Sequence, residues 1–181
     1  LKEFIAYAKA RPGKLSYGFG TSAALLCGEL FKSMTGTDIV KVPYKGSPQS
    51  LTDLAADRIQ MVCEPFGTSM PFVKSGKMKI LASTNTMRSS HAPDVPTMTE
   101  QGFESSQVNS WYAIAVPKKT PRPVIERLNR DINQLLAEDD TISRIDKIGG
   151  TVIGGWTPQQ TTKMFADEYA RWAEVARKAG L

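Results

Sequence analysis

A run of apolar, β-branched residues that ends in a short turn and opens into a helical pattern constrains this chain more than any other feature. The run occupies residues 39–42, and the turn consists of Pro43, Tyr44, Lys45 and Gly46. Ser47 and Pro48 then suit the N-cap and the first turn of a helix. A strand, loop and helix in this order collect unpaired backbone N–H groups at the helix N-terminus, where they favour an anion. We therefore expect this loop to hold a carboxylate rather than to react with one.

The same alternation of strand and helix repeats along the first half of the chain. Strand patterns occur at residues 15–19, 39–42, 59–63 and 78–83, and helical patterns at residues 2–9, 23–35, 48–56 and 69–74. Repeated strand–loop–helix units predict a mainly parallel sheet with helices on its faces.

The pattern changes after residue 84. Residues 85–110 are rich in Ser, Pro, Asn and Thr, which predicts a long connection. Beyond it we expect strands at residues 111–116 and 151–153, and helices at residues 123–137, 142–148 and 158–178. Two strands beside so much helix make a poor core of their own. We therefore expect the partner strands to lie in a stretch that precedes the present chain.

Charge and motif content argue against several classes of function. The net charge of +5 comes from scattered Lys and Arg residues, which does not favour a nucleic-acid surface. No segment is long and apolar enough to insert into a membrane. His91 is the only histidine, which excludes a multi-histidine metal site, and no cofactor fingerprint is present. A doubly wound enzyme is kept as an alternative, although it would need a nucleophile and base that the motifs do not supply.

The sequence does not decide whether the two cysteines are free or bonded to each other. Cys27 falls in a helical pattern and Cys63 in a strand pattern. Two cysteines make neither a disulfide scaffold nor a zinc site. Buried free thiols are the expected state. A bond between them would require Cα atoms within about 7 Å of each other, which the sequence does not show.

A series of short motifs runs in order along the whole chain. Its members are Gly28-Glu29-Leu30-Phe31, Val42-Pro43-Tyr44-Lys45-Gly46, Thr52-Asp53-Leu54, Pro93-Asp94-Val95-Pro96-Thr97, Trp111, Trp172 and Ala179-Gly180. This series resembles the Bug-type periplasmic solute receptors that serve tripartite tricarboxylate transporters.

The resemblance implies an α/β, periplasmic-binding-protein-like fold with two lobes that close on a ligand like a flytrap. Residues 1–105 would be the middle segment, which forms the second lobe, and residues 106–181 the C-terminal part of an incomplete first lobe. The resemblance further implies a periplasmic, non-catalytic protein without cofactor that captures a small carboxylate and presents it to a membrane permease. A ligand-sensing or partner-binding domain outside transport would use the same pocket and is kept as an alternative.

By position in this family, two loops and one acidic residue are candidates for the ligand site. The candidates are Gly18, Gly20, Thr21 and Ser22 in the first loop, Pro43, Tyr44, Lys45 and Gly46 in the second, and Glu64 after the third strand. The glycines permit close approach of a ligand to backbone N–H groups. Relatives usually carry a histidine where Leu25 stands, and often an aspartate where Glu64 stands. We expect Glu64 to accept hydrogen bonds from a ligand amino or hydroxyl group, and Asp53 to cap or pair within its own helix.

Overall fold

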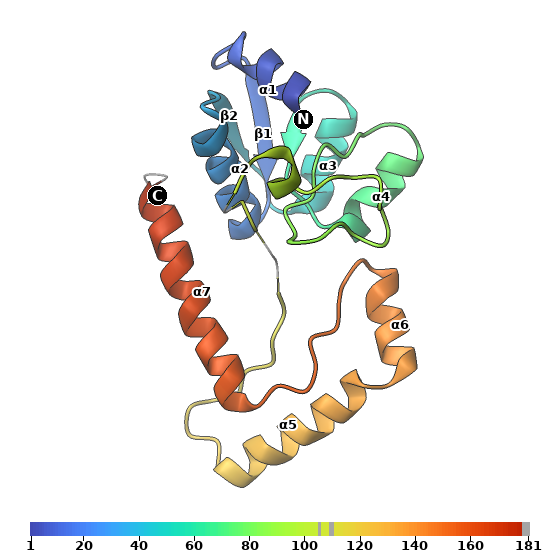
Figure 1. The fold of residues 1–181 in the computed structure, drawn as a ribbon, viewed down its shortest axis with the longest axis vertical. Coiled ribbons are helices and arrows are strands. Elements are labelled where there is room, and N and C mark those ends of the chain that lie inside the picture. Colours follow the sequence, from blue (N-terminus) through green and yellow to red (C-terminus); the bar gives the residue numbers. More distant parts are fainter. Residues whose placement is uncertain (105, 109–110, 179–181) are drawn as a thin grey trace. The chain divides into compact units, whose positions relative to one another are not determined.

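The computed structural model describes residues 1–104, 106–108 and 111–178, which form two compact units (Figure 1). The first unit covers the described residues up to 108, and the second covers Trp111–Lys178. Ala179 and Gly180, the last members of the motif series, lie outside the described residues.

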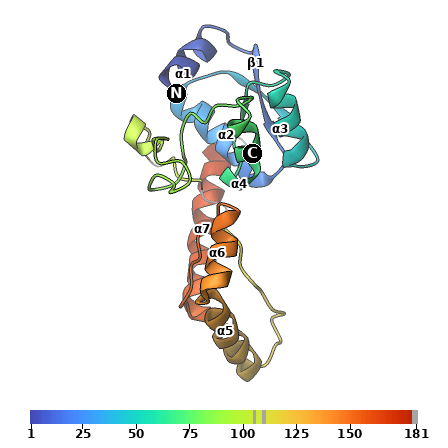
Figure 2. The same ribbon diagram turned by 90° about the vertical axis from the view of Figure 1, so that its right-hand side faces the viewer.

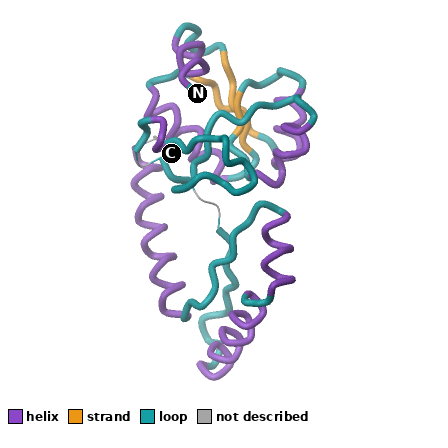
Figure 3. Tube along the Cα trace, turned by 45° about the vertical axis from the view of Figure 1, so that its right-hand side comes forward, coloured by secondary structure: helices purple, strands orange, loops and turns teal. Residues whose placement is uncertain are grey.

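A three-stranded parallel sheet forms the centre of the first unit (Figure 3, orange). Its strands are β1 (Leu15–Phe19), β2 (Ile39–Pro43) and β3 (Met61–Val62), in the order β2-β1-β3. Tyr17 of β1 pairs with Lys41 on one side and with Met61 on the other. The predicted parallel sheet is therefore confirmed, with β3 shorter than expected.

Four helices accompany this sheet: α1 (Lys2–Lys9), α2 (Ser22–Thr35), α3 (Ser47–Ala55) and α4 (Phe66–Lys74). Figures 1 and 2 both show α2 and α3 on opposite sides of β1. This arrangement follows from the strand order, because the right-handed crossover from β1 to β2 and the one from β2 past β1 to β3 run in opposite directions and place their helices on opposite faces. The loops after β1 and β2 therefore leave the same edge of the sheet toward opposite faces, which is where open α/β sheets bind ligands.

Tyr17 lies at the centre of the core and is fully buried. A Cβ atom at Gly28 would come within 2.2 Å of the Tyr17 ring, so the ring and the α2 backbone are in direct contact. The Tyr17 hydroxyl donates a hydrogen bond of 2.6 Å to Glu29 Oε1. Burial, followed by this hydrogen bond, raises the pKa of Tyr17. Both contacts hold α2 against β1 in one register.

Cys27 and Cys63 form a disulfide with a Cα–Cα distance of 6.3 Å, so the expectation of free thiols was wrong. The folded sheet brings α2 beside the end of β3, a proximity that two cysteines 36 residues apart do not reveal in sequence. The bond joins the middle of α2 to the residue that precedes Glu64.

Local side-chain and backbone features mark the ends of α2 and the start of α3. Thr21 is the N-cap of α2, where its Oγ1 accepts a hydrogen bond of 3.1 Å from Ala24 N, and Gly36 ends the helix with φ of 63°. The expected N-cap of α3 was wrong by one residue, because Gly46 takes the cap position and Ser47 is the first helical residue.

Three expected strands are not strands in the described part of the chain. Residues 78–83 form only one isolated parallel bridge, between Ser83 and Thr97. Residues 111–116 and 151–153 are without regular structure. A strand is stable only when a neighbour pairs its backbone groups, and Tyr112 in the first of these segments is 98% exposed.

The long connection contains a local structure that explains one of the motifs. Thr97 N donates to Glu100 Oε2 at 2.7 Å, and Glu100 N donates to Thr97 Oγ1 at 3.1 Å. This reciprocal pair is a capping box at the start of the short 3₁₀ helix η1 (Thr99–Gln101). Arg88 adds an ion pair of 3.0 Å to Glu100. These side-chain bonds, together with the single bridge from Thr97 to Ser83, fix the segment around Thr97 and Glu100.

The second unit consists of α5 (Arg122–Leu136), α6 (Asp139–Lys147) and α7 (Pro158–Lys178) with their connections. Asn129 and Asn133 donate hydrogen bonds of 2.9 Å and 3.0 Å to the Trp156 carbonyl oxygen, which ties α5 to the segment before α7. The predicted helices are confirmed within a few residues at their ends. Among the described residues, no helix has the length and apolarity that crossing a membrane requires.

Candidate functional site

The two predicted loops lie against each other at the carboxyl edge of the sheet. A Cβ atom at Gly20 would stand 2.4 Å from the Gly46 carbonyl carbon and 2.8 Å from Ser47 N, so no side chain fits between these backbones. Tyr44 N donates to Phe19 O at 2.8 Å and joins the two loops where they leave the sheet. The structure thus brings the β1–α2 and β2–α3 loops into direct backbone contact.

Gly18 lies beneath this contact and is buried. A Cβ atom there would stand 2.5 Å from Ile59 Cδ1, 2.9 Å from the Tyr44 ring and 3.1 Å from Ser50 Cβ. Gly18 therefore acts through packing, because its missing side chain lets Tyr44 and Ser50 close over the strand end.

Two helix N-termini begin at this edge. The helix α2 starts at Ser22 and α3 starts at Ser47, directly after the loops that meet. The first N–H groups of a helix have no partners within it and carry a partial positive charge, so the edge favours an anion. Thr21, Ser22, Pro43 and Lys45 are exposed there, and the Thr21 Oγ1 already accepts the cap bond from Ala24.

Tyr44 forms one side of the site, but its hydroxyl is already engaged. It donates to Asp53 Oδ2 at 2.9 Å, and Asp53 Oδ1 is 2.9 Å from Arg58 Nη1. Burial, and then the hydrogen bond to Asp53, raise the pKa of Tyr44. Asp53 thus pairs with Tyr44 before α3 and with Arg58 after it, so the expectation of a partner within its own helix was wrong, and the trio holds the second loop onto that helix.

Replacing Tyr44 by phenylalanine tests this assignment. We expect Tyr44→Phe to lower stability by about 1 kcal/mol, the usual net value of one such hydrogen bond, and the melting temperature by roughly 2–4 °C. Ligand affinity should change by less than about twofold, because the hydroxyl serves Asp53. Thermal unfolding and calorimetric titration measure the two quantities. An unchanged melting temperature with a large loss of affinity would instead assign the hydroxyl to the ligand.

Glu64 follows β3 and lies beside the first turn of α3. Its Oε1 is buried and has no hydrogen-bond partner among the described residues. Burial raises the pKa of Glu64, and the hydroxyl groups of Ser47 and Ser50 partly offset this rise. The sequence reasoning missed Ser50 as a neighbour of the site. The signal was available, since a serine one helical turn after Ser47 faces the same side.

In the described part of the chain, neither Leu25 nor a cluster of metal-ligating side chains adds a ligand group to this edge of the sheet. Leu25 is partly buried and packs against the core. The described residues contain no group of three or more His, Cys, Asp or Glu side chains that could hold a metal ion.

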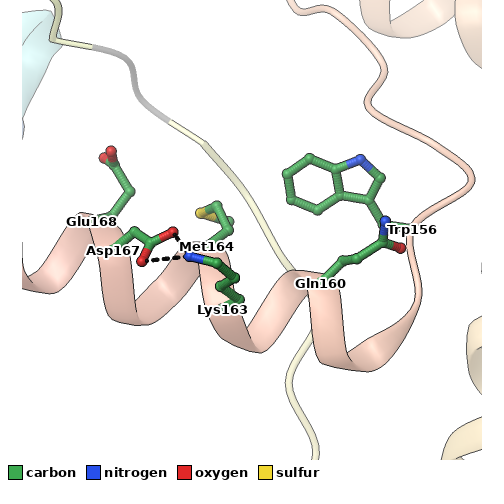
Figure 4. A pocket seen from close by; sticks show the side chains of 6 residues that line it. All are labelled: Trp156, Gln160, Lys163, Met164, Asp167 and Glu168. Carbon is green, nitrogen blue, oxygen red and sulfur yellow. Dashed lines mark hydrogen bonds and ion pairs between the residues drawn. The ribbon is translucent and has the colours of Figure 1, made fainter.

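A hollow of about 470 Å³ lies on the second unit along α7 (Figure 4). It is lined by Trp156, Gln160, Lys163, Met164, Asp167 and Glu168. Lys163 and Asp167 pair with each other at 2.7 Å, and Glu168 pairs with Arg171 at 3.1 Å. Because these charges are matched within the helix, the hollow is a weaker candidate than the backbone site at the sheet edge.

Known proteins are similar to this chain in sequence and in fold. A family model described as tripartite tricarboxylate transporter family receptor matches residues 1–181. BugT of Bordetella pertussis is 36% identical over 99% of this chain and 56% of that protein. The solved structure of R. palustris Rpa4515 with adipate has a TM-score of 0.91 at 35% identity, over 99% of this chain and 60% of that one. The periplasmic binding protein BugD has a TM-score of 0.88 at 29% identity, over 99% and 61%.

This chain spans between 56% and 61% of the length of these relatives. The structural matches confirm the expected α/β, periplasmic-binding-protein-like fold. The motifs at both loops, the parallel sheet and the match along residues 1–181 together show that the chain belongs to the receptor family of tripartite tricarboxylate transporters, with the Bug proteins among its relatives.

Proposed function

We propose that this chain is part of an extracytoplasmic solute-binding receptor that captures a small carboxylate without transforming it. The observation that carries the proposal is the backbone contact of Gly20 with Gly46 and Ser47, which sets the N-termini of α2 and α3 side by side at the sheet edge. Backbone N–H groups in this arrangement bind a carboxylate without a cationic side chain. The adipate in the related Rpa4515 structure supports a ligand of this class.

The proposal includes a location and an organisation for the receptor. The disulfide between Cys27 and Cys63 is typical of an oxidising compartment, which supports the periplasm. Residues 1–105 would form the second lobe of the receptor, and residues 106–181 the C-terminal part of its first lobe. Closure of the two lobes on the ligand would produce the form that the membrane permease of the transporter recognises.

A titration of the complete receptor tests this proposal. Mono-, di- and tricarboxylates of two to eight carbons are added in turn, and heat of binding and thermal stability are measured. We expect one chemical subset to bind and, at 100 times its dissociation constant, to stabilise the protein by about 2.7 kcal/mol, or roughly 5–10 °C. Absence of heat and of stabilisation with every acid in the panel would refute the proposed function.

A further inference from the structure

Glu64 is a half-buried residue with one shielded carboxyl oxygen, and it lies beside the proposed anion site. Its Oε1 is shielded from solvent and lacks a hydrogen-bond partner among the described residues. The disulfide at Cys63 holds the backbone directly before it against α2. A carboxyl group in this place adds a negative charge beside the proposed anion site when it is ionised and none when it is protonated.

The polar groups that approach this carboxyl are hydroxyls. Ser47 and Ser50 face it from the first turn of α3. Ser50 is fully buried, and its hydroxyl donates its single proton to the Ser47 carbonyl oxygen at 2.9 Å. The Ser50 oxygen is then left to accept a hydrogen bond. A protonated Glu64 can donate to this oxygen, whereas an ionised Glu64 is left with the Ser47 hydroxyl as its donor.

The charged groups on the surrounding elements do not compensate an ionised Glu64. On α3, Asp53 is paired with Arg58, and in the β2–α3 loop Lys45 is exposed. Burial raises the pKa of Glu64, and the hydroxyl groups of Ser47 and Ser50 partly offset the rise. The nearby residues of the other elements are Gly18 at the end of β1 and the disulfide-bonded Cys27 of α2. Neither residue has a titratable side chain.

We propose that Glu64 stands in the occupied site as a neutral carboxylic acid, so that the receptor selects anionic acids without a positive group and takes up one proton as it binds them. This inference rests on the proposed function. An ionised Glu64 would repel an incoming carboxylate where little water screens the two charges, and a neutral one does not. A zwitterionic amino acid would instead favour the ionised form through its ammonium group. The proton comes from solvent and is returned when the ligand leaves.

The test compares matched acids on the complete receptor. Succinate, glutarate and adipate are titrated calorimetrically against aspartate, glutamate and 2-aminoadipate, in Hepes and Tris buffers, whose ionisation enthalpies differ. For the best unsubstituted acid we expect uptake of close to one proton at pH 7.5. Its affinity should fall by up to about tenfold per pH unit above the carboxyl pKa of the free protein. The amino derivative should bind about tenfold or more weakly.

The variant Glu64→Gln imitates the protonated side chain. It should bind the same acid without proton uptake, with an affinity that no longer falls between pH 6.5 and 8.5. Glu3→Gln, which removes an exposed carboxyl group from α1, is the matched control and should behave like the wild-type protein.

Three results would overturn the inference. They are acid binding by the wild-type protein without proton uptake, equal proton uptake by wild-type protein and Glu64→Gln, and a preference for the amino derivative that Glu64→Gln abolishes. Acid binding by the wild-type protein without proton uptake is decisive even when Glu64→Gln does not fold. In each of the three the proposed function survives, because an acid still binds. Failure of every acid to bind the wild-type protein would refute both proposals together.

Discussion

Replacing Gly20 by alanine is expected to abolish ligand binding and to destabilise the first unit. The new methyl group would stand 2.4 Å and 2.6 Å from the carbonyl carbon and Cα of Gly46, and these are backbone atoms that cannot rotate away. The two loops must therefore separate, which by analogy with overpacked cores lowers stability by about 1–3 kcal/mol. Displacing two backbone donors from a charged ligand, at about 1.5–3 kcal/mol each, corresponds to a loss of affinity of 100-fold or more.

Gly46→Ala is the matched control for this prediction. A Cβ atom at Gly46 would meet only Pro48 Cδ, at 3.7 Å, and the residue has an extended backbone with φ of 173°, which alanine adopts readily. We expect this variant to unfold within about 0.5 kcal/mol of the wild-type protein. Denaturant unfolding and calorimetry of both variants give the comparison. Equal stability of the two variants would show that the loops do not depend on their contact.

Removing the disulfide is expected to cause the largest loss of stability. The bond closes a loop with a sequence separation of 36. The chain-entropy relation assigns about 4 kcal/mol to a loop of this length, and disulfides typically contribute about 2–4 kcal/mol. Cys27→Ala/Cys63→Ala should therefore melt roughly 5–15 °C below the wild-type protein.

Reduction provides the control for this second prediction. A reducing agent should lower the urea midpoint of the wild-type protein toward that of the double variant and leave the double variant unchanged. A wild-type midpoint that reduction does not move would contradict a stabilising role for the bond.

The elements of the first unit follow from the sequence because each is marked by local chemistry. Thr21 and Gly36 mark the ends of α2, and the β-branched run at residues 39–42 becomes β2. The segment at residues 78–83 has the same apolar character but makes only the bridge from Ser83 to Thr97. Strand formation depends on a partner in space, which a local pattern does not contain.

At the site, the topology of the sheet could be foreseen from the sequence, whereas the distances between its elements could not. The convergence of the loops after β1 and β2 follows from parallel strands, whose carboxyl ends share one edge. The contact between Gly20 and Gly46, the capture of the Tyr44 hydroxyl by Asp53 and the disulfide each depend on distances between elements. The Glu64 oxygen, which has no hydrogen-bond partner in the described part of the chain, could not be foreseen for a further reason, since a residue type does not reveal how far its environment is dehydrated.

The contact between Gly28 and the Tyr17 ring has a thermodynamic consequence for recognition. Because the α2 backbone touches the ring, the helix cannot slide along β1, and the amides at its first turn keep a constant position relative to the strand end. A ligand that docks there meets a preorganised wall and loses little free energy to ordering it. Affinity in this half of the site should accordingly be limited by how well a guest matches the existing spacing of donors, which favours discrimination by ligand length.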